Sequence, residues 1–376
     1  GDWSSDVCSS DLSYTKNTKM FSPPGVIIFN SPAKSHKFVG SPCIVKLHDN
    51  TYIASHDVFG NTISNTYIYK TINKGKNWDK IAVIEKLNWS TLFLINKELY
   101  ILGVRPKNVE GFGDCVIHKS TDGGYTWTFP SDDKHGILCE GDFHSAPTSI
   151  LFHQGIIWKG MEEKNKDNTP YSAFVISAKD NTNLLDSKNW IISNKLIYNT
   201  NYLKNSLTWL EGNIIIDRNN KIKNILRIKN PEDDIAAIID VDPDRKYISF
   251  KVDSGLIKLP GAGKKFTLRY DNFSNKYWTL SNYVPNKIET VNNEYMRNTI
   301  ALVCSDNLLD WQIRSILLHH PNHKKYGFQY IDWFIDGDDI AAVSRTAWED
   351  ETGEACNQHD ANYFLFHRFL NFREKL

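Results

Sequence analysis

The sequence has no excess of charge of either sign. Its 376 residues include 44 Lys and Arg and 44 Asp and Glu, so the formal net charge is zero. Nucleic-acid-binding proteins usually carry a basic patch, and chains with acidic tails often have solvating or chaperone-like roles. The even balance therefore argues against both classes.

Cysteine motifs and long apolar runs are also missing. The six cysteines are scattered singly, without a Cys-x-x-Cys or Cys/His spacing that would indicate zinc. A domain of this size does not need a disulfide framework, so we expect most of these thiols to be buried. No apolar run is long enough to span a membrane.

No convincing amphipathic helix interrupts the chain, and short β-rich runs take its place. Aromatic residues make up 12% of the sequence, which favours strands. The runs group in fours with a period of roughly 50–65 residues, as in propeller repeats. We predict an all-β chain forming one β-propeller of six blades with four antiparallel strands each, and seven blades remain the alternative.

The two ends of the chain depart from the repeated strand pattern. Residues 1–12, GDWSSDVCSSDL, differ from the Lys/Asn/Ile-rich sequence that follows and resemble translated adapter sequence. We expect residues 1–19 to be a non-native or disordered segment and residues 20–376 to form the propeller. The last group of runs lacks a fourth strand, which Gly25–Phe29 would supply by closing the ring.

The strongest local signal is the segment Ser120–Trp127, STDGGYTW, which we expect to join strands at Cys115–Lys119 and Thr126–Phe129. An Asp side chain can cap the backbone of such a turn, and paired glycines permit positive φ. A related turn lies at Thr71–Trp78, with weaker ones at Ser305–Trp311 and in the region from Ser177 to Trp190. We expect these turns to be architectural.

The pattern S-x-D-x-G-x-T-W resembles the Asp-box (BNR) turn of sialidase-type β-propellers. Segments such as HSAPTSILFHQGIIWKGME and NQHDANYFLFHRF also resemble sialidase-superfamily proteins of polysaccharide-degrading bacteria. The resemblance implies an oligosaccharide or polysaccharide substrate and a monomer that binds neither nucleic acid nor membranes. It also implies a secreted or periplasmic protein, with a cytoplasmic location left open.

In that family the Asp boxes lie on the face opposite the active site. The functional face is then the one where first strands begin and second strands end. Three residues at these positions are our catalytic candidates: His56, His144 and Glu211. Arginines could pair with a sugar carboxylate, while aromatic and polar groups could hold the sugar ring. The substrate-binding candidates are Asp57, Arg105, Glu162, Trp209, Arg227, Tyr283, Tyr330, Arg345 and Asp360.

Family resemblance also suggests chemistry. Sialidases use an arginine triad, a Tyr/Glu nucleophile pair and an Asp acid/base, but Ser41-Pro42 stands here in place of the early Arg-Ile-Pro signature. No Tyr/Glu pair can be assigned from the sequence. A second resemblance is to propeller enzymes that remove terminal rhamnose from glucuronate, which implies proton transfer by His56.

The sequence therefore predicts an exo-acting enzyme that cleaves a terminal glycosidic bond next to an acidic sugar. A lyase would need an arginine to neutralise the carboxylate and a histidine base. A hydrolase would need two carboxylates, with Glu211 paired to Glu162 or Asp360 as candidates. The alternative is a non-catalytic glycan-binding propeller. No cofactor or metal is expected, since no ligand motif indicates the axial cation that the fold could accommodate.

Overall fold

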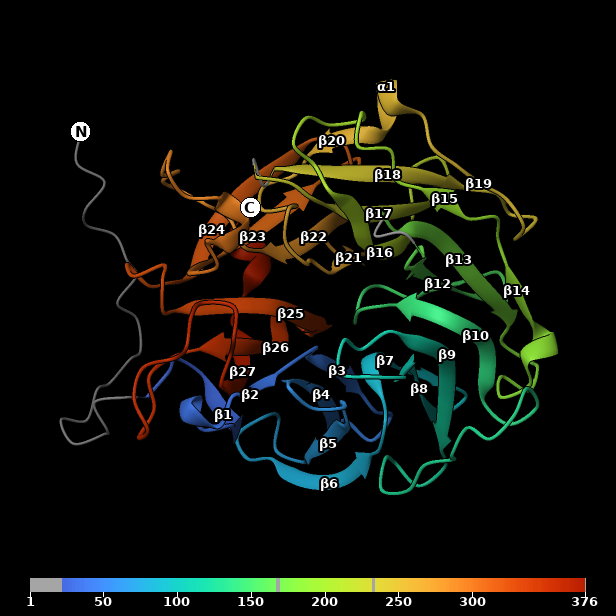
Figure 1. The fold of residues 1–376 in the computed structure, drawn as a ribbon, viewed down its shortest axis with the longest axis horizontal. Helices are drawn as coiled ribbons and strands as arrows, with labels where there is room; N and C mark the ends of the chain where they lie inside the picture. The colour runs from blue at the N-terminus through green and yellow to red at the C-terminus, as the bar shows by residue number, and fades with distance from the viewer. Residues whose placement is uncertain (1–21, 167–169, 232–233, 376) are drawn as a thin grey trace.

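The computed structural model describes residues 22–166, 170–231 and 234–375, so the predicted segment 1–19 lies outside the described residues. Described strands fall into five sheets that follow one another around a ring (Figure 1). The longest of the described helices is four residues, and none of them is long and apolar enough to cross a membrane. The predicted all-β propeller arrangement is confirmed.

The first two sheets hold the N-terminal half. One contains β2 (Lys37–Val39), β3 (Cys43–Lys46), β4 (Tyr52–Gly60), β5 (Thr66–Thr71) and β6 (Asp79–Ile84). The next, with nine strands, contains β7 (Asn88–Ile95), β8 (Glu98–Pro106), β9 (Gly113–Ser120), β10 (Ile137–His144), β11 (Leu151–His153), β12 (Ile156–Glu163), β13 (Ser172–Lys179), β14 (Trp190–Ile192) and β15 (Leu196–Ile197).

Three sheets complete the ring. The third contains β16 (Thr208–Ile216), β17 (Ile222–Lys229), β18 (Ile235–Val241), β19 (Ile248–Ser249) and β20 (Leu256–Lys258), with the short helix α1 (Val252–Gly255) before β20. The fourth contains β21 (Leu268–Asp271), β22 (Lys276–Ser281), β23 (Thr299–Ser305) and β24 (Trp311–His319). The last contains β25 (Gly327–Asp336), β26 (Asp339–Ala347), β27 (Tyr363–Phe369) and β1 (Val26–Asn30).

The ring closes through its N-terminal strand. β1 pairs antiparallel with β27, with Val26 opposite Phe366 and Asn30 opposite Tyr363. The order of the last sheet is β1-β27-β26-β25, so the predicted closing role of Gly25–Phe29 is confirmed. Pairing the two ends of the chain removes an exposed sheet edge.

One predicted strand is wrong. Thr126–Phe129 forms no strand, and β9 pairs instead with β10, where Ile137 lies opposite Val116. Pro130 follows directly and has no N–H for a ladder hydrogen bond, which explains why pairing stops there. β10 also pairs with β12, with His144 opposite Glu162, and thereby joins two predicted units into one sheet.

The Asp-box turn has the predicted geometry. Asp122 Oδ1 accepts the N–H groups of Tyr125 (3.1 Å) and Thr126 (3.0 Å), and Asp122 Oδ2 accepts the Thr126 hydroxyl at 2.6 Å. Trp127 Nε1 folds back to donate to the Gly124 carbonyl at 2.9 Å. Thr71–Trp78 and Ser305–Trp311 repeat this tryptophan contact, at 3.1 and 3.0 Å. Each turn is therefore closed by its own residues.

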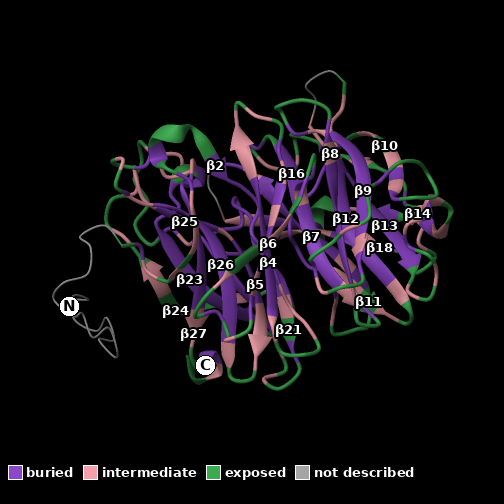
Figure 2. Cartoon of the chain, turned by 90° about the horizontal axis from the view of Figure 1, so that it is seen from below, coloured by how far each residue is buried: buried purple, intermediate pink, exposed green. Residues whose placement is uncertain are grey.

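Inner strands of different sheets are tied together at the axis. Asn213 Oδ1 accepts the N–H groups of Ser149 (3.2 Å) and Leu268 (3.0 Å), which joins three sheets. Asp332 likewise accepts the N–H of Ile44 at 2.9 Å and so links the last sheet to the first. Buried residues follow the strands, while exposed residues gather in the loops at their ends (Figure 2).

Two buried ammonium groups belong to this inner layer. Lys159 Nζ donates to the Ala146 carbonyl and the Thr148 hydroxyl, both at 2.7 Å. Lys265 Nζ donates to the Thr267 hydroxyl at 2.8 Å and the Ile331 carbonyl at 2.7 Å. Burial lowers the pKa of Lys159 and of Lys265 to about 8.

Candidate active site

Three first strands carry a bulge where they begin. The register shifts within β7, β16 and β25 coincide with positive φ angles at Trp89 (51°), Glu211 (61°) and Tyr330 (55°). A left-handed backbone at a non-glycine residue costs roughly 1–3 kcal/mol. Bulges of this kind re-aim side chains and are common beside active sites. The repeated strain marks this end of the strands as the functional face.

The bulges of β16 and β25 bring a tyrosine and a glutamate together. Tyr330 Oη donates to Glu211 Oε1 at 2.7 Å, and Arg227 Nη1 contacts both Glu211 Oε2 (3.0 Å) and Tyr330 Oη (3.3 Å). The Tyr/Glu pair that could not be assigned from the sequence is therefore present in the structure.

Arg227 is balanced by carboxylates. Besides Glu211, it pairs through Nη2 with Glu294 at 3.2 Å, and its Nε donates to the Gly263 carbonyl at 2.6 Å. All three charged side chains are almost completely buried. The charge of Arg227 is therefore paired within the protein, and breaking these ion pairs would leave a buried charge without a partner.

This environment favours an ionised Glu211 and a protonated Tyr330. Burial opposes ionisation of Glu211, but the charge of Arg227 outweighs it and the pKa of Glu211 is lowered. Burial, reinforced by the charge of Glu211, raises the pKa of Tyr330. Tyr330 is therefore a neutral phenol beside an ionised acceptor, which is the arrangement that activates a hydroxyl nucleophile.

Two further arginines have no such balance. Arg297 Nη1 donates to Gln329 Oε1 at 2.6 Å, and Arg345 Nη2 donates to the same oxygen at 3.3 Å. The guanidinium of Arg345 stacks on the Tyr330 ring, 3.9 Å from its centre, and that of Arg297 lies 5.9 Å from it. Within the described chain no carboxylate pairs with either arginine, although they are only 3% and 5% exposed.

Arg345 lacks a hydrogen-bond partner for part of its guanidinium in the described chain, and its charge acts on His359. Arg345 Nε is buried without a hydrogen-bond partner among the described residues. Burial, despite the nearby Tyr330, lowers the pKa of Arg345 to about 10. Burial, followed by the charge of Arg345, lowers the pKa of His359 to about 3, and its Nδ1 lies 2.9 Å from Asp360. Arg297 and Arg345, which share the side-chain oxygen of Gln329, form a candidate site for an anion. We call these two arginines the arginine pair.

A histidine–carboxylate pair adjoins the Tyr/Glu pair. His144 Nδ1 lies 2.9 Å from Glu162 Oε2, and Glu162 Oε1 accepts the N–H of Gly212, next to Glu211. The ring of Trp89 packs on His144 at 4.4 Å between ring centres. Orientation by a buried carboxylate leaves Nε2 as the ring nitrogen of His144 that Glu162 does not hold; His144 packs against Tyr171, which lines the cavity described below, and does not line it itself.

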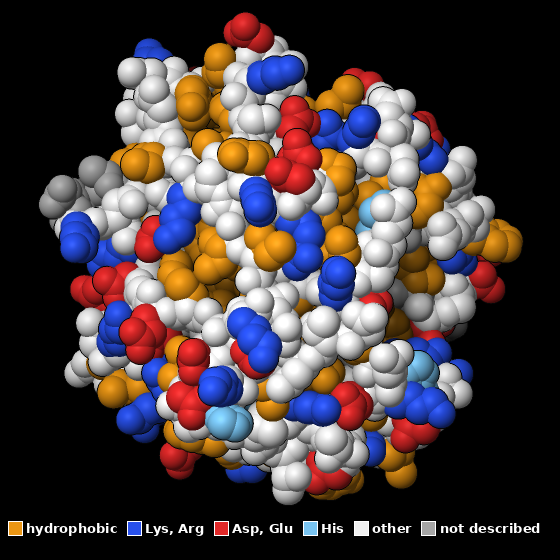
Figure 3. All heavy atoms as spheres, turned by 90° about the vertical axis from the view of Figure 1, so that its right-hand side faces the viewer, with side chains coloured by type: hydrophobic (Ala, Val, Ile, Leu, Met, Phe, Trp, Pro, Cys, Tyr) orange, Lys and Arg blue, Asp and Glu red, His pale blue; other side chains and the backbone are white. Residues whose placement is uncertain are grey.

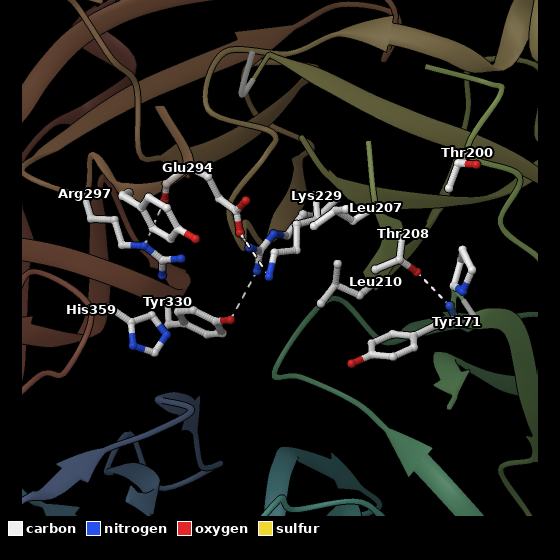
Figure 4. Close-up of a pocket in the computed structure, with 13 residues that line it drawn as sticks. Tyr171, Thr200, Leu207, Thr208, Leu210, Lys229, Glu294, Arg297, Tyr330 and His359 are labelled. Carbon is white, nitrogen blue, oxygen red and sulfur yellow. Dashed lines mark hydrogen bonds and ion pairs between the residues drawn. The ribbon is translucent and has the colours of Figure 1, made fainter. Parts of the chain in front are cut away.

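Arg297 of the arginine pair and Tyr330 of the Tyr/Glu pair line a cavity of about 570 Å³. Arg297, Tyr330 and His359 lie on one side of it, and Leu207, Thr208, Leu210 and Tyr171 lie on the other (Figure 4). Lys229 and Glu294 stand between the two sides. None of the Asp-box residues Ser120–Trp127 lines it. The volume is within the roughly 300–1,000 Å³ of small-molecule sites and has room for more than one sugar ring.

Several sequence-predicted residues meet at this site. Glu211, Arg227 and Tyr330 are joined by hydrogen bonds, and Arg345 stacks on the Tyr330 ring. His144 and Glu162 adjoin them, and Asp360 reaches the cavity only through His359.

His56 is placed elsewhere. Its ring is fully buried between Phe29, Tyr67 and Phe364, its Nδ1 bonds the Asp57 carbonyl at 2.8 Å, and burial lowers its pKa to about 4. A general base must reach the substrate, and this packing keeps His56 from the cavity. We do not carry His56 into the proposed chemistry.

The remaining candidates have structural contacts. Both carboxylate oxygens of Asp57 accept backbone N–H groups, from Ser41 at 2.8 Å and Trp89 at 2.6 Å. Arg105 pairs with Asp114 at 2.8 Å. Trp209 is buried and donates to the Tyr171 carbonyl at 3.2 Å, and Tyr283 is absent from the cavity lining.

Four residues of the site were missed: Tyr171, Glu294, Arg297 and His359. They precede or lie between strands, whereas the sequence argument considered mainly the ends of first and second strands. His359 alone had a signal, its adjacency to the predicted Asp360.

Other kinds of site have less support. Among the described residues no group of three or more His, Cys, Asp and Glu side chains could hold a metal ion. Basic and acidic side chains are interspersed on the face drawn in Figure 3, in agreement with the zero net charge.

Comparison with known proteins supports the fold. No protein-family model matches the chain, and no curated protein matches it in sequence. An α-L-arabinanase from Penicillium chrysogenum, solved with arabinobiose, is similar with a TM-score of 0.60 and 13% identity, over 94% of this chain and 99% of that one.

Two other solved structures agree. An α-L-arabinofuranosidase from Fusarium graminearum, solved with an iminosugar inhibitor, has a TM-score of 0.59 and 14% identity over 93% of this chain and 98% of that one. A protein of unknown function from Dyadobacter fermentans has a TM-score of 0.60 and 10% identity over 93% of this chain and 100% of that one. These similarities show that the chain shares the overall fold of these proteins.

Proposed function

We propose that this protein is an exo-acting glycosidase that cleaves the terminal glycosidic bond of an acidic sugar, with Tyr330 as nucleophile. The observation that carries the proposal is the hydrogen bond between Tyr330 Oη and Glu211 at 2.7 Å, beneath which Arg345 stacks without a carboxylate partner. The glycosidase folds of the similar arabinanase and arabinofuranosidase support it. We also infer six blades, counting the nine-stranded sheet as two.

A tyrosine nucleophile narrows the class of sugar that the site is expected to cleave. A carboxylate nucleophile would be repelled by a carboxylate on the reacting carbon, whereas a neutral phenol approaches it without that penalty. The arginine pair lies against the ring of Tyr330, so an anion bound there lies close to the reacting carbon. These features favour a 2-ulosonic acid, the class to which sialic acids belong.

The residues support a two-step displacement. Tyr330 Oη attacks the anomeric carbon and gives its proton to Glu211, while the glycosidic bond breaks and His144 Nε2 protonates the departing oxygen. Water, deprotonated by His144, then attacks the same carbon, and Tyr330 leaves with the proton returned from Glu211. The net reaction is hydrolysis with retention, and it uses only side chains of this protein and water.

The test uses 4-methylumbelliferyl glycosides of N-acetylneuraminic acid, 3-deoxy-octulosonic acid and glucuronic acid. We expect cleavage of at least one ulosonic acid glycoside, and a loss of at least about 10³-fold in kcat for Tyr330→Phe. Tyr125→Phe, on the exposed Asp-box turn, is the matched control. A 3-fluoro ulosonosyl fluoride should leave a covalent adduct on Tyr330 by mass spectrometry.

Three outcomes would contradict the proposal. Full turnover by Tyr330→Phe removes the nucleophile. An ultraviolet-absorbing unsaturated product would show elimination, as in the predicted lyase. Glycan binding without cleavage of any substrate would leave a binding propeller. A monomeric state and a secreted or periplasmic location remain predictions.

A further inference from the structure

The cavity continues past the Tyr330 hydroxyl, away from the arginine pair. Its far wall is made by Tyr171, Leu207 and Leu210, on the opposite side from Arg297 (Figure 4). Leu207 is 58% exposed at the rim, whereas Leu210 is 8% exposed at the base. We call these three residues the leucine wall.

The leucine wall is held in place by its neighbours. The Tyr171 N–H donates to the Thr208 hydroxyl at 2.8 Å, and its carbonyl accepts from Trp209 Nε1 at 3.2 Å. The Tyr171 ring packs against His144, 5.8 Å between ring centres. Trp209, predicted to bind substrate, acts here by fixing Tyr171. A surface fixed in this way can bind without paying an ordering cost.

The geometry points to the leucine wall as the subsite of the leaving sugar, a hexopyranose that lays its C–H face on Leu207 and Tyr171. This inference rests on the proposed function. If the carboxylate occupies the arginine pair and the reacting carbon lies at Tyr330, the departing oxygen points to the opposite wall. His144, the proposed proton donor, packs on that same wall. Apolar and aromatic lining with a few polar groups is typical of such sites.

Two substrates with one terminal sugar isolate this contact: 3′-sialyllactose, whose leaving group is lactose, and N-acetylneuraminyl fluoride, whose leaving group is a single atom. Leu207→Ala should lower kcat/KM for sialyllactose about tenfold and leave the fluoride unchanged. Binding of free lactose, followed by saturation-transfer NMR, should weaken in the same variant. Leu309→Ala, at a leucine 52% exposed in the Asp-box turn Ser305–Trp311, is the matched control and should change none of these.

Equal losses on both substrates, or no loss on either, would overturn the subsite. If the wild-type protein cleaves neither probe, the proposed function fails for sialic acid, and lactose binding then decides the subsite on its own. Lactose bound equally by wild type and Leu207→Ala would reject it.

Discussion

The mouth of this propeller contains two arginine environments with opposite electrostatics. Arg227 lies between two buried carboxylates, Glu211 and Glu294, while Arg297 and Arg345 share one neutral amide oxygen of Gln329. Burying a charge is costly unless it is paired. The first environment is paired within the protein, and a bound anion would complete the second. One arginine is therefore expected to hold the fold, and the other two to hold the substrate.

Replacing each type of arginine by methionine gives the largest expected contrast. Arg227→Met leaves Glu211 without an ion pair and Glu294 with only Lys229, at 3.6 Å, and should lower the free energy of unfolding by about 3–5 kcal/mol. Arg345→Met removes an unpaired buried charge, so stability should stay level or rise, while kcat/KM for an acidic substrate falls at least about 30-fold. Denaturant unfolding and steady-state kinetics check both. Equal destabilisation by the two variants would erase the distinction.

Exchanging amide and carboxylate tests the same contrast without changing shape. Gln329→Glu supplies an anion to the arginine pair, but it also removes the hydrogen bonds that Gln329 Nε2 donates to the Gln358 (2.7 Å) and His359 (2.9 Å) carbonyls. We therefore expect weaker binding of acidic sugars and no gain in the free energy of unfolding. Glu294→Gln removes one of the two anions around Arg227 and should destabilise by about 1–2 kcal/mol. Thermal unfolding with and without N-acetylneuraminic acid measures both. Undiminished binding of N-acetylneuraminic acid by Gln329→Glu would contradict an anion site.

A third test extends the comparison to buried cations that bind only neutral oxygens. The folded pKa of Lys159 is about 8, below its ordinary value of 10.5. Below pH 8 the lysine is charged in both states and its burial penalty is complete. Between pH 8 and 10.5 the folded state has lost the proton that the unfolded state keeps, so stability rises with pH, by up to about 3 kcal/mol.

Lys159→Met should remove that rise. The variant is expected to be more stable than the wild type at pH 7, with the difference closing towards pH 10. Urea unfolding at pH 7, 8, 9 and 10 measures it. A difference independent of pH would show that Lys159 stays charged in the folded protein throughout.

The fold was predictable from sequence because its signals are local. The turn Ser120–Trp127 is closed by hydrogen bonds within eight residues. The residue patterns of β26 and β18 likewise indicate a strand from the segment itself, without knowledge of the strands with which it pairs. The error at Thr126–Phe129 arose where the next strand, Ile137–His144, followed an insertion rather than the turn itself.

The site was less accessible because its contacts join distant parts of the chain. Glu211 and Tyr330 were both on the list of candidates, but 119 residues separate them and only the closed ring brings them into contact. Glu294 and Arg297 lie in the connection between β22 and β23, where the order of the strands does not predict which way a side chain points. His56 had a suggestive neighbour in Asp57, but its ring points into the aromatic packing between β4 and β27.

The three left-handed residues at the starts of β7, β16 and β25 have a consequence for protein engineering. Glycine adopts such φ angles freely, so Trp89→Gly, Glu211→Gly and Tyr330→Gly would each relieve local strain. The same exchanges would remove the ring on which His144 packs, the proton acceptor and the nucleophile. Relief of about 1–3 kcal/mol of strain is offset at Glu211 by the lost ion pair with Arg227, and at Trp89 and Tyr330 by lost ring packing. The strained residues are therefore held by the contacts of their own side chains, and a screen for heat resistance would not favour glycine there.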